Sequence, residues 1–110
     1  MFSIIIPTLN NLNHLKLCLK SLKRNSVLNN EIIIHVSMGK DGTRDYLNEQ
    51  NIKYTFTDYN AGIAEGANSA AQKCKYDYIL YSHDDFYFCP EWDLILKKEI
   101  NNIGHKKFYL

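Results

Sequence analysis

The chain has 110 residues, of which 45% are hydrophobic and 23% are charged, and its formal net charge is +1. This length and composition predict one small soluble globular domain with a buried core. The balanced charge argues against a nucleic-acid partner or an anionic membrane surface, and no apolar run reaches the length of a membrane span.

The cysteines and the N-terminus predict the cellular compartment. Cys18, Cys74 and Cys89 are odd in number and show no closely paired metal spacing. They are expected to be reduced thiols used in packing, which indicates a cytoplasmic protein. Residues 1–7 contain neither a basic leader nor a long apolar core, so no signal peptide is predicted.

The chain opens with a predicted strand and helix. Ser3–Ile6 is a short β-branched run that Pro7 is expected to stop. A polar turn follows, in which Asn10 or Asn11 is the expected helix cap. Leucines at helical spacing then predict a helix: Leu12, Leu15, Leu19 and Leu22. Its other face carries Lys16, Lys20, Lys23 and Arg24. A solvated face is the simpler interpretation of these cations, and an anion-binding face is the alternative.

A second and a third strand are predicted next. Glu31–Val36 is a continuous isoleucine-rich run, typical of a strand covered on both faces, and its His35 is expected to be a core histidine rather than a ligand. Asp41 is the expected cap of a short helix that places Tyr46 and Leu47 in the core. Polar and apolar residues alternate weakly over Lys53–Thr57, which predicts a peripheral strand.

The third predicted helix runs from about residue 61 to residue 74 and is rich in glycine and alanine. Its expected inward residues are Ile63, Ala67, Ala70 or Ala71, and Cys74. Gly66 within it costs roughly 1 kcal/mol relative to alanine, which predicts a close approach of the helix to the sheet or to a ligand.

Residues 78–81 form the fourth predicted strand, which ends abruptly in Ser82-His83-Asp84-Asp85. Two carboxylates and an imidazole at the C-terminal end of a strand indicate a site for a divalent cation and a phosphate group. An acidic turn is the alternative. Pro90 begins a fourth predicted helix that Gly104 ends, and residues 108–110 are expected to open another strand.

The resulting βαβαβαβα pattern predicts an α/β fold, with a mostly parallel sheet and helices on both faces. Right-handed crossovers restrict the topology, and we expect the strand order 3-2-1-4. The loops after Ile6, Val36 and Ser82 would then converge on one crevice beside the switch point between the first and fourth strands.

Four short motifs occur in order: Ser3 to Asn10, Asp41 to Thr43, Asn60 to Asn68, and His83 to Asp85. Together they resemble the nucleotide-binding half of a family 2 glycosyltransferase of GT-A fold, over about residues 2–95. Such enzymes transfer a sugar from a nucleoside diphosphate, usually with Mg²⁺ or Mn²⁺. The resemblance implies one Rossmann-like GT-A domain over residues 1–110 that stops before the acceptor-binding half, and a UDP-sugar donor.

The resemblance also implies site residues, position by position. The expected nucleotide-binding residues are Thr8, Asn10, Ser37, Asp41, Asn60, Gly62, Asn68, His83 and Asp84. Asp85 is the first choice of metal ligand and Asp84 the second. The chain departs from the family pattern at Leu9, which replaces an aromatic residue, and at Val36 and Ser37, which replace the acids that hold the base. His83 replaces the first Asp of the Asp-x-Asp motif.

No catalytic base is assigned, because Glu91 and Asp93 fit a helix start better than a catalytic position. Whether the chain is an enzyme therefore stays open between two hypotheses. The first is a glycosyltransferase, or its donor-binding fragment. The second is a degenerate non-catalytic nucleotide-binding or self-associating module, suggested by Val36, Ser37 and His83.

Two other α/β classes fit less well. A receiver-type signalling domain carries its Asp pair after the first strand, where this chain has Pro7 to Asn10. A nucleotidyltransferase needs a glycine-rich loop bearing Lys or Arg at that place, and this sequence has none.

The expected partners are a nucleotide-sugar and an acceptor that is a glycan, a lipid or a protein. Loss of a second half would uncover one side of the fourth strand together with Phe86, Tyr87, Phe88 and Trp92. Such an apolar patch predicts homo-oligomers, as dimers or larger.

Overall fold

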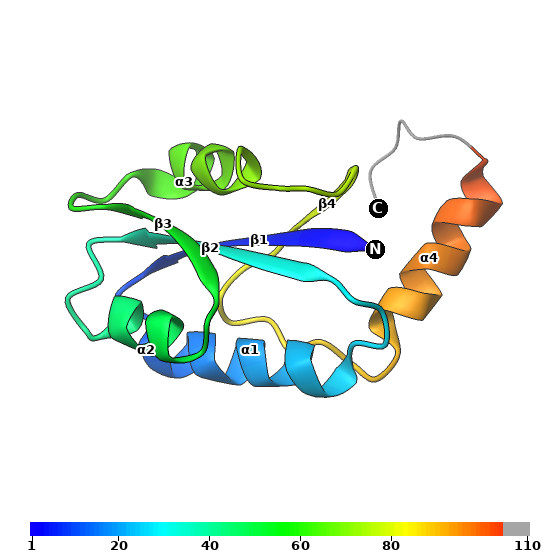
Figure 1. Ribbon diagram of the computed structural model, residues 1–110, viewed down its shortest axis with the longest axis horizontal. Helices are drawn as coiled ribbons and strands as arrows, with labels where there is room; N and C mark the ends of the chain where they lie inside the picture. Colours follow the sequence, from blue (N-terminus) through cyan, green and yellow to red (C-terminus); the bar gives the residue numbers. More distant parts are fainter. Residues whose placement is uncertain (105–110) are drawn as a thin grey trace.

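The computed structural model describes residues 1–104 as strands and helices in strict alternation (Figure 1). The strands are β1 (Phe2–Leu9), β2 (Glu31–Ser37), β3 (Lys53–Thr57) and β4 (Tyr78–Tyr81). The helices are α1 (Leu12–Asn25), α2 (Thr43–Glu49), α3 (Gly62–Ala71) and α4 (Trp92–Ile103). The strand predicted over residues 108–110 lies outside the described residues.

The strands form one parallel sheet in the order β3-β2-β1-β4, which confirms the predicted order. β1 is central: its Ser3 pairs with Glu31 of β2 on one side and with Ile79 of β4 on the other. Because all strands run the same way, the loops that follow them leave from one edge of the sheet.

β1 continues past Pro7, so the prediction that this proline stops the strand is wrong. Pro7 pairs with His35 of β2, whereas the pairing with β4 ends at Ile5 and Tyr81. The Ile5 carbonyl accepts a hydrogen bond from the Ser82 N–H, so the backbone of Ile5 faces β4. Because a strand repeats every two residues, the backbone of Pro7 faces the same side. Pro7 therefore faces a side where β4 has already ended, and its missing N–H removes no ladder bond.

Helices cover both faces of the sheet, as predicted. Figure 1 shows α3 on one side and α1 and α2 on the other. The larger core lies on the α1 side and joins Phe2, Ile4 and Ile6 to Leu15, Leu19, Leu22 and Leu47, and to Ile100 of α4. On the α3 side, Ile5 and Ile33 pack against Ala70. All three cysteines are free, with Cys18 buried in the larger core and Cys89 exposed.

α3 packs tightly against the sheet at Gly66, above His35. A Cβ atom at position 66 would lie 3.0 Å from His35 Cδ2 and 3.4 Å from Pro7 Cβ. His35 is 1% exposed, and its ring nitrogens hydrogen-bond the hydroxyls of Thr55 at 2.7 Å and Thr57 at 3.2 Å. Burial lowers its pKa, and the Glu65 charge opposes this only in part. His35 is thus a core histidine, as expected.

Gly66→Ala is expected to destabilise the protein, although alanine favours a helix by about 1 kcal/mol. The added methyl group meets an imidazole that two threonines hold in place, so overpacking outweighs propensity and we expect a net loss of about 1 kcal/mol. Urea unfolding measures the change. Asn68→Ala, at an exposed position of the same helix, is the control and should not destabilise. Equal or greater stability of Gly66→Ala would show that His35 can move.

The prediction that Ile63 faces inward is wrong, because its side chain is 60% exposed. The close contacts of α3 begin one turn later, at Gly66. The apolar patch predicted near β4 is partly present. Ile79, Tyr81, Phe86 and Tyr87 are exposed, whereas Phe88 and Trp92 are half-buried and pack together with ring centroids 4.9 Å apart.

α4 is held to the rest of the domain by a buried carboxylate. Asp93 is 0% exposed and accepts hydrogen bonds from the backbone N–H groups of Val27 and Leu28 and from the Asn30 side chain, at 2.7 to 3.1 Å. Burial opposes its ionisation, but these donors outweigh burial and lower its pKa. Asp93 therefore does more than begin a helix as expected, because it also fixes the loop between α1 and β2.

Candidate functional site

The loops after β1 and β4 meet through a hydrogen bond between side chains. The Thr8 hydroxyl donates to Asp84 Oδ2 at 2.8 Å, joining residues that are far apart in the sequence. Beneath them, the Cys18 thiol donates to the His83 carbonyl at 3.8 Å. The acidic end of β4 therefore lies against the end of β1, as the strand order predicted.

Asp84 and Asp85 form the negative part of this edge. Asp84 is half-buried and Asp85 is exposed. Burial, followed by the negative charges of Asp84 and then Asp85, raises the pKa of Cys18 to about 11. Both carboxylates thus act on one thiol, although only Asp84 is held by Thr8. Asp85 makes no side-chain hydrogen bond within residues 1–104.

The loops after β1 and β2 are also tied together. Asn10 Oδ1 accepts from the Lys40 N–H at 3.0 Å, and Asp41 Oδ2 accepts from the Leu12 N–H at 2.9 Å. Asn11 is the N-cap residue of α1 but makes no capping bond with its side chain. Asn11 thus has the predicted N-cap position, but it is Asp41 from the neighbouring loop whose side chain accepts an N–H of the first turn, that of Leu12.

Asp41 serves its own loop as well. Its Oδ1 accepts from the N–H of Thr43 at 3.3 Å and from the Thr43 hydroxyl. Burial disfavours the charged form, but the bonds from Thr43 and Leu12 outweigh burial and lower the pKa of Asp41. Gly42 occupies the N-cap position of α2, so Asp41 acts one residue earlier than predicted.

A polar hollow of about 350 Å³ lies beside these contacts. Asn10 and Asp41, both predicted site residues, line it together with Asn11, Leu12, Asn13 and His14. The sequence analysis missed Asn11 and His14 as lining residues. The available signal was their place directly after the Pro7 to Asn10 motif, at the start of a helix whose N–H groups attract anions.

The loop before α3 joins the same edge through Ser37. This serine is 4% exposed, and its hydroxyl accepts from the Ala61 N–H at 3.3 Å. Asn60 Oδ1 accepts from the Gly62 N–H at 3.0 Å, and Gly62 has a φ of +76°, a left-handed conformation that suits glycine. Ser37 therefore holds a turn, rather than presenting its side chain to solvent.

His83 and Asn68 are both exposed but differ in their surroundings. The His83 ring lies between Tyr81 and Phe86, with centroid distances of 5.2 and 5.1 Å. Asn68 lies in the second half of α3, and its side chain makes no hydrogen bond within the described part of the chain. Thr8 and Asp84 are joined by a hydrogen bond, and Asn10 and Asp41 line the polar hollow, whereas Asn68 takes part in neither arrangement.

The donor atoms at this edge suit a hard cation that brings further ligands with it. Within residues 1–104, no group of three or more His, Cys, Asp or Glu side chains is arranged to hold a metal ion. Two neighbouring carboxylates are nevertheless what Mg²⁺-like ions use when phosphate oxygens and water complete their coordination. Asp85 has both oxygens available, and Asp84 has one that Thr8 does not engage.

Comparison with known proteins gives one consistent result. Residues 3–106 match the sequence profile of Glycosyl transferase family 2. An uncharacterized glycosyltransferase of Haemophilus influenzae is 33% identical over 95 residues, which are 83% of this chain and 31% of the relative. The chain therefore spans about a third of the length of this curated relative.

Solved structures share the fold at low sequence identity. S. aureus TarS (residues 1–349) in complex with UDP-GlcNAc has a TM-score of 0.77 and 20% identity, over 94% of this chain and 31% of TarS. The mannosyltransferase PcManGT from Pyrobaculum calidifontis, in complex with GDP-Man and Mn²⁺, has a TM-score of 0.71 and 17% identity, over 86% of this chain and 30% of that one. The arrangement of strands and helices is thus that of glycosyltransferases.

Proposed function

Because this chain belongs to glycosyl transferase family 2, we propose that it binds the nucleoside-diphosphate part of a sugar donor, UDP in the first instance, at the loop edge of its sheet. The observation that supports this most directly is the Thr8–Asp84 hydrogen bond. It joins the first and last motifs of the predicted site across the point where the strand order reverses, which is where α/β sheets bind ligands.

The proposed roles follow from exposure and contacts. Asp85, exposed and without a side-chain partner among the described residues, is the main ligand for Mn²⁺ or Mg²⁺, and Asp84, fixed by Thr8, is the second. Asn10 and Asp41 shape the polar hollow for the nucleotide. Ser37 and Asn60 act by holding the loop that ends at Gly62. His83 and Asn68 are exposed and available to phosphate or ribose.

A bound divalent cation would neutralise charge on the diphosphate leaving group. The chain's own contribution is to fix the Asp84 carboxylate through Thr8 before the nucleotide binds, with Asp85 beside it. Asp93 is excluded as a catalytic base because it is 0% exposed. Residues 1–110 are proposed as a single donor-binding domain, and the base and the acceptor site are proposed to lie outside it.

Calorimetry with UDP tests the proposal. We expect UDP to bind in the presence of Mn²⁺ at least about tenfold more tightly than in EDTA, a difference of about 1.4 kcal/mol, because the cation bridges phosphate to carboxylate. CDP and GDP under the same conditions measure the preference for the base. None of the described helices has the length and apolar character needed to cross a membrane.

The same titration separates the two functional hypotheses. Binding that does not respond to Mn²⁺ favours the degenerate module, since Val36, Ser37 and His83 stand where the family has acids. No heat with any of the three nucleotides would contradict both the transferase and the nucleotide-binding module.

A further inference from the structure

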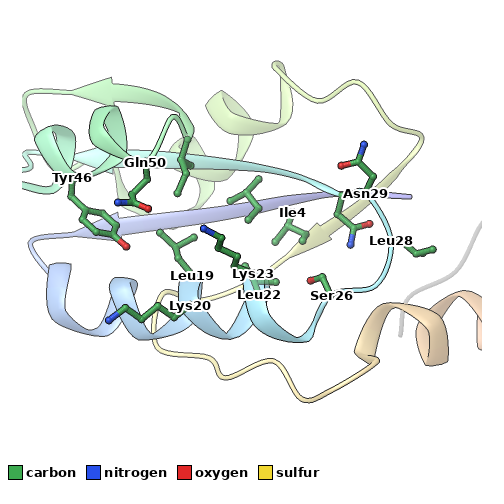
Figure 2. A pocket seen from close by; sticks show the side chains of 13 residues that line it. Ile4, Leu19, Lys20, Leu22, Lys23, Ser26, Leu28, Asn29, Tyr46 and Gln50 are labelled. Carbon is green, nitrogen blue, oxygen red and sulfur yellow. The ribbon is translucent and has the colours of Figure 1, made fainter.

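A second hollow lies on the α1 side of the sheet, away from the loop edge (Figure 2). It has a volume of about 550 Å³, within the range of roughly 300–1,000 Å³ typical of small-molecule sites. Its walls are the second half of α1, the loop leading to β2, and the end of α2. Its apolar lining consists of Ile4, Leu19, Leu22, Leu28, Ile32 and Ile52.

The rim of this hollow is cationic on one side. Lys20 and Lys23 both extend from α1 at its edge (Figure 2). No acidic residue lines the hollow, and within residues 1–104 the single salt bridge is between Lys53 and Glu31. Neither lysine therefore has a carboxylate partner in the described part of the chain. A third cation lies nearby, since the Lys16 ammonium is 5.1 Å from the centroid of the Tyr46 ring, another part of the wall.

We propose that this hollow binds a single-chain anionic amphiphile, a molecule of the fatty-acid type. Its aliphatic chain lies over the half-buried Leu28, Ile32 and Ile52, and its acid group lies at Lys20 and Lys23. The proposal does not depend on the donor site, because the two hollows share no lining residue. It gives the lysine face of α1 its anion-binding role in place of a purely solvated one.

The volume of the hollow favours a small ligand. Ile4, Leu19 and Leu22 are at most 4% exposed and form its floor, so the surface open to an apolar ligand is that of Leu28, Ile32 and Ile52 on its walls. Tyr46 and Gln50 lie toward one end of the hollow, and Asn29 lies toward the other (Figure 2).

Methyl NMR of the whole chain tests this with sodium dodecanoate below its micelle concentration. We expect saturable shifts of the methyl groups of Leu19, Leu28, Ile32 and Ile52. Dodecanoate should bind about tenfold more tightly than uncharged dodecanol, and dodecyltrimethylammonium more weakly than either, because two partly exposed ion pairs separate acid from alcohol.

Paired variants decide the role of the cations. Lys20→Gln with Lys23→Gln should weaken dodecanoate about tenfold and leave dodecanol unchanged, whereas Lys97→Gln with Lys98→Gln, on exposed positions of α4, should change neither. The proposal is wrong if shifts gather at Ile79 and Ile95, if the cationic amphiphile binds as well as dodecanoate, or if both pairs act alike. Binding only to phosphatidylglycerol vesicles would assign these lysines to a membrane surface and also overturn it.

Discussion

Asp85→Asn is expected to lower the Mn²⁺-dependent affinity for UDP by more than roughly tenfold, since even partners outside a metal's coordination sphere typically contribute 10- to 100-fold. The amide keeps the shape of the side chain but lacks the charge that a hard cation prefers. Because Asp85 is exposed and makes no side-chain hydrogen bond among residues 1–104, stability should stay within about 0.5 kcal/mol. Calorimetry with and without Mn²⁺ measures the loss.

Further variants locate the effect. Asp84→Asn should also weaken Mn²⁺-dependent binding, and Thr8→Val should do so to a smaller extent, because it removes only the donor that positions Asp84. Glu99→Gln, an exposed change on α4, is the control and should bind normally. Full Mn²⁺ dependence in Asp85→Asn but none in Asp84→Asn would transfer the main metal role to Asp84.

Asp93→Ala is expected to lower the free energy of unfolding by about 3 kcal/mol at neutral pH. The variant leaves the N–H groups of Val27 and Leu28 and the Asn30 amide without their acceptor in a buried position, and hydrogen bonds to a charged group contribute roughly 1.5–3 kcal/mol each. Urea unfolding measures the loss, which should exceed that of Glu99→Gln. A loss below about 1 kcal/mol would mean that water replaces the carboxylate.

The loss should also depend on pH. The folded pKa of Asp93 is lowered, relative to about 3.9 for an unfolded aspartate. The carboxylate therefore contributes its full stability above about pH 3.9, and this contribution disappears as the pH falls through the folded value. We expect the difference in the free energy of unfolding between the parent protein and Asp93→Ala to be constant from pH 5 to pH 8. It should become smaller only in stronger acid.

Most of the fold could be predicted because the local patterns agree with it. The predicted strands over residues 53–57 and 78–81 match β3 and β4, and the alternation of strands and helices predicted the parallel sheet that the structure shows. The errors arose where a neighbouring strand or sheet face determines the structure. Pro7 stays in β1 because β4 stops short of it. Ile63 is exposed because α3 faces the sheet with Gly66 and Ala70, its buried residues.

The site was predictable in outline but not in its contacts. Strand ends alone placed Thr8 and Asp84 on one edge, yet the bond between them depends on side-chain positions that no spacing specifies. Asp41 accepts a hydrogen bond from the N–H of Leu12, the first residue of α1. A local sequence pattern can predict only that Asp41 caps the helix that follows it. Asp93 gave no sign of burial, because its partners at residues 27–30 are distant in sequence.

The central position of β1 has a consequence for how the chain acquires its structure. Ser3 must find Glu31 on one side and Ile79 on the other, so every pairing in this sheet closes a long loop before hydrogen bonds reward it. The pairing of β1 with Tyr78–Tyr81 spans the longest stretch of chain, so it carries the largest entropic cost of the three. Without it β1 has an open edge, which is the kind of surface on which other copies can pair.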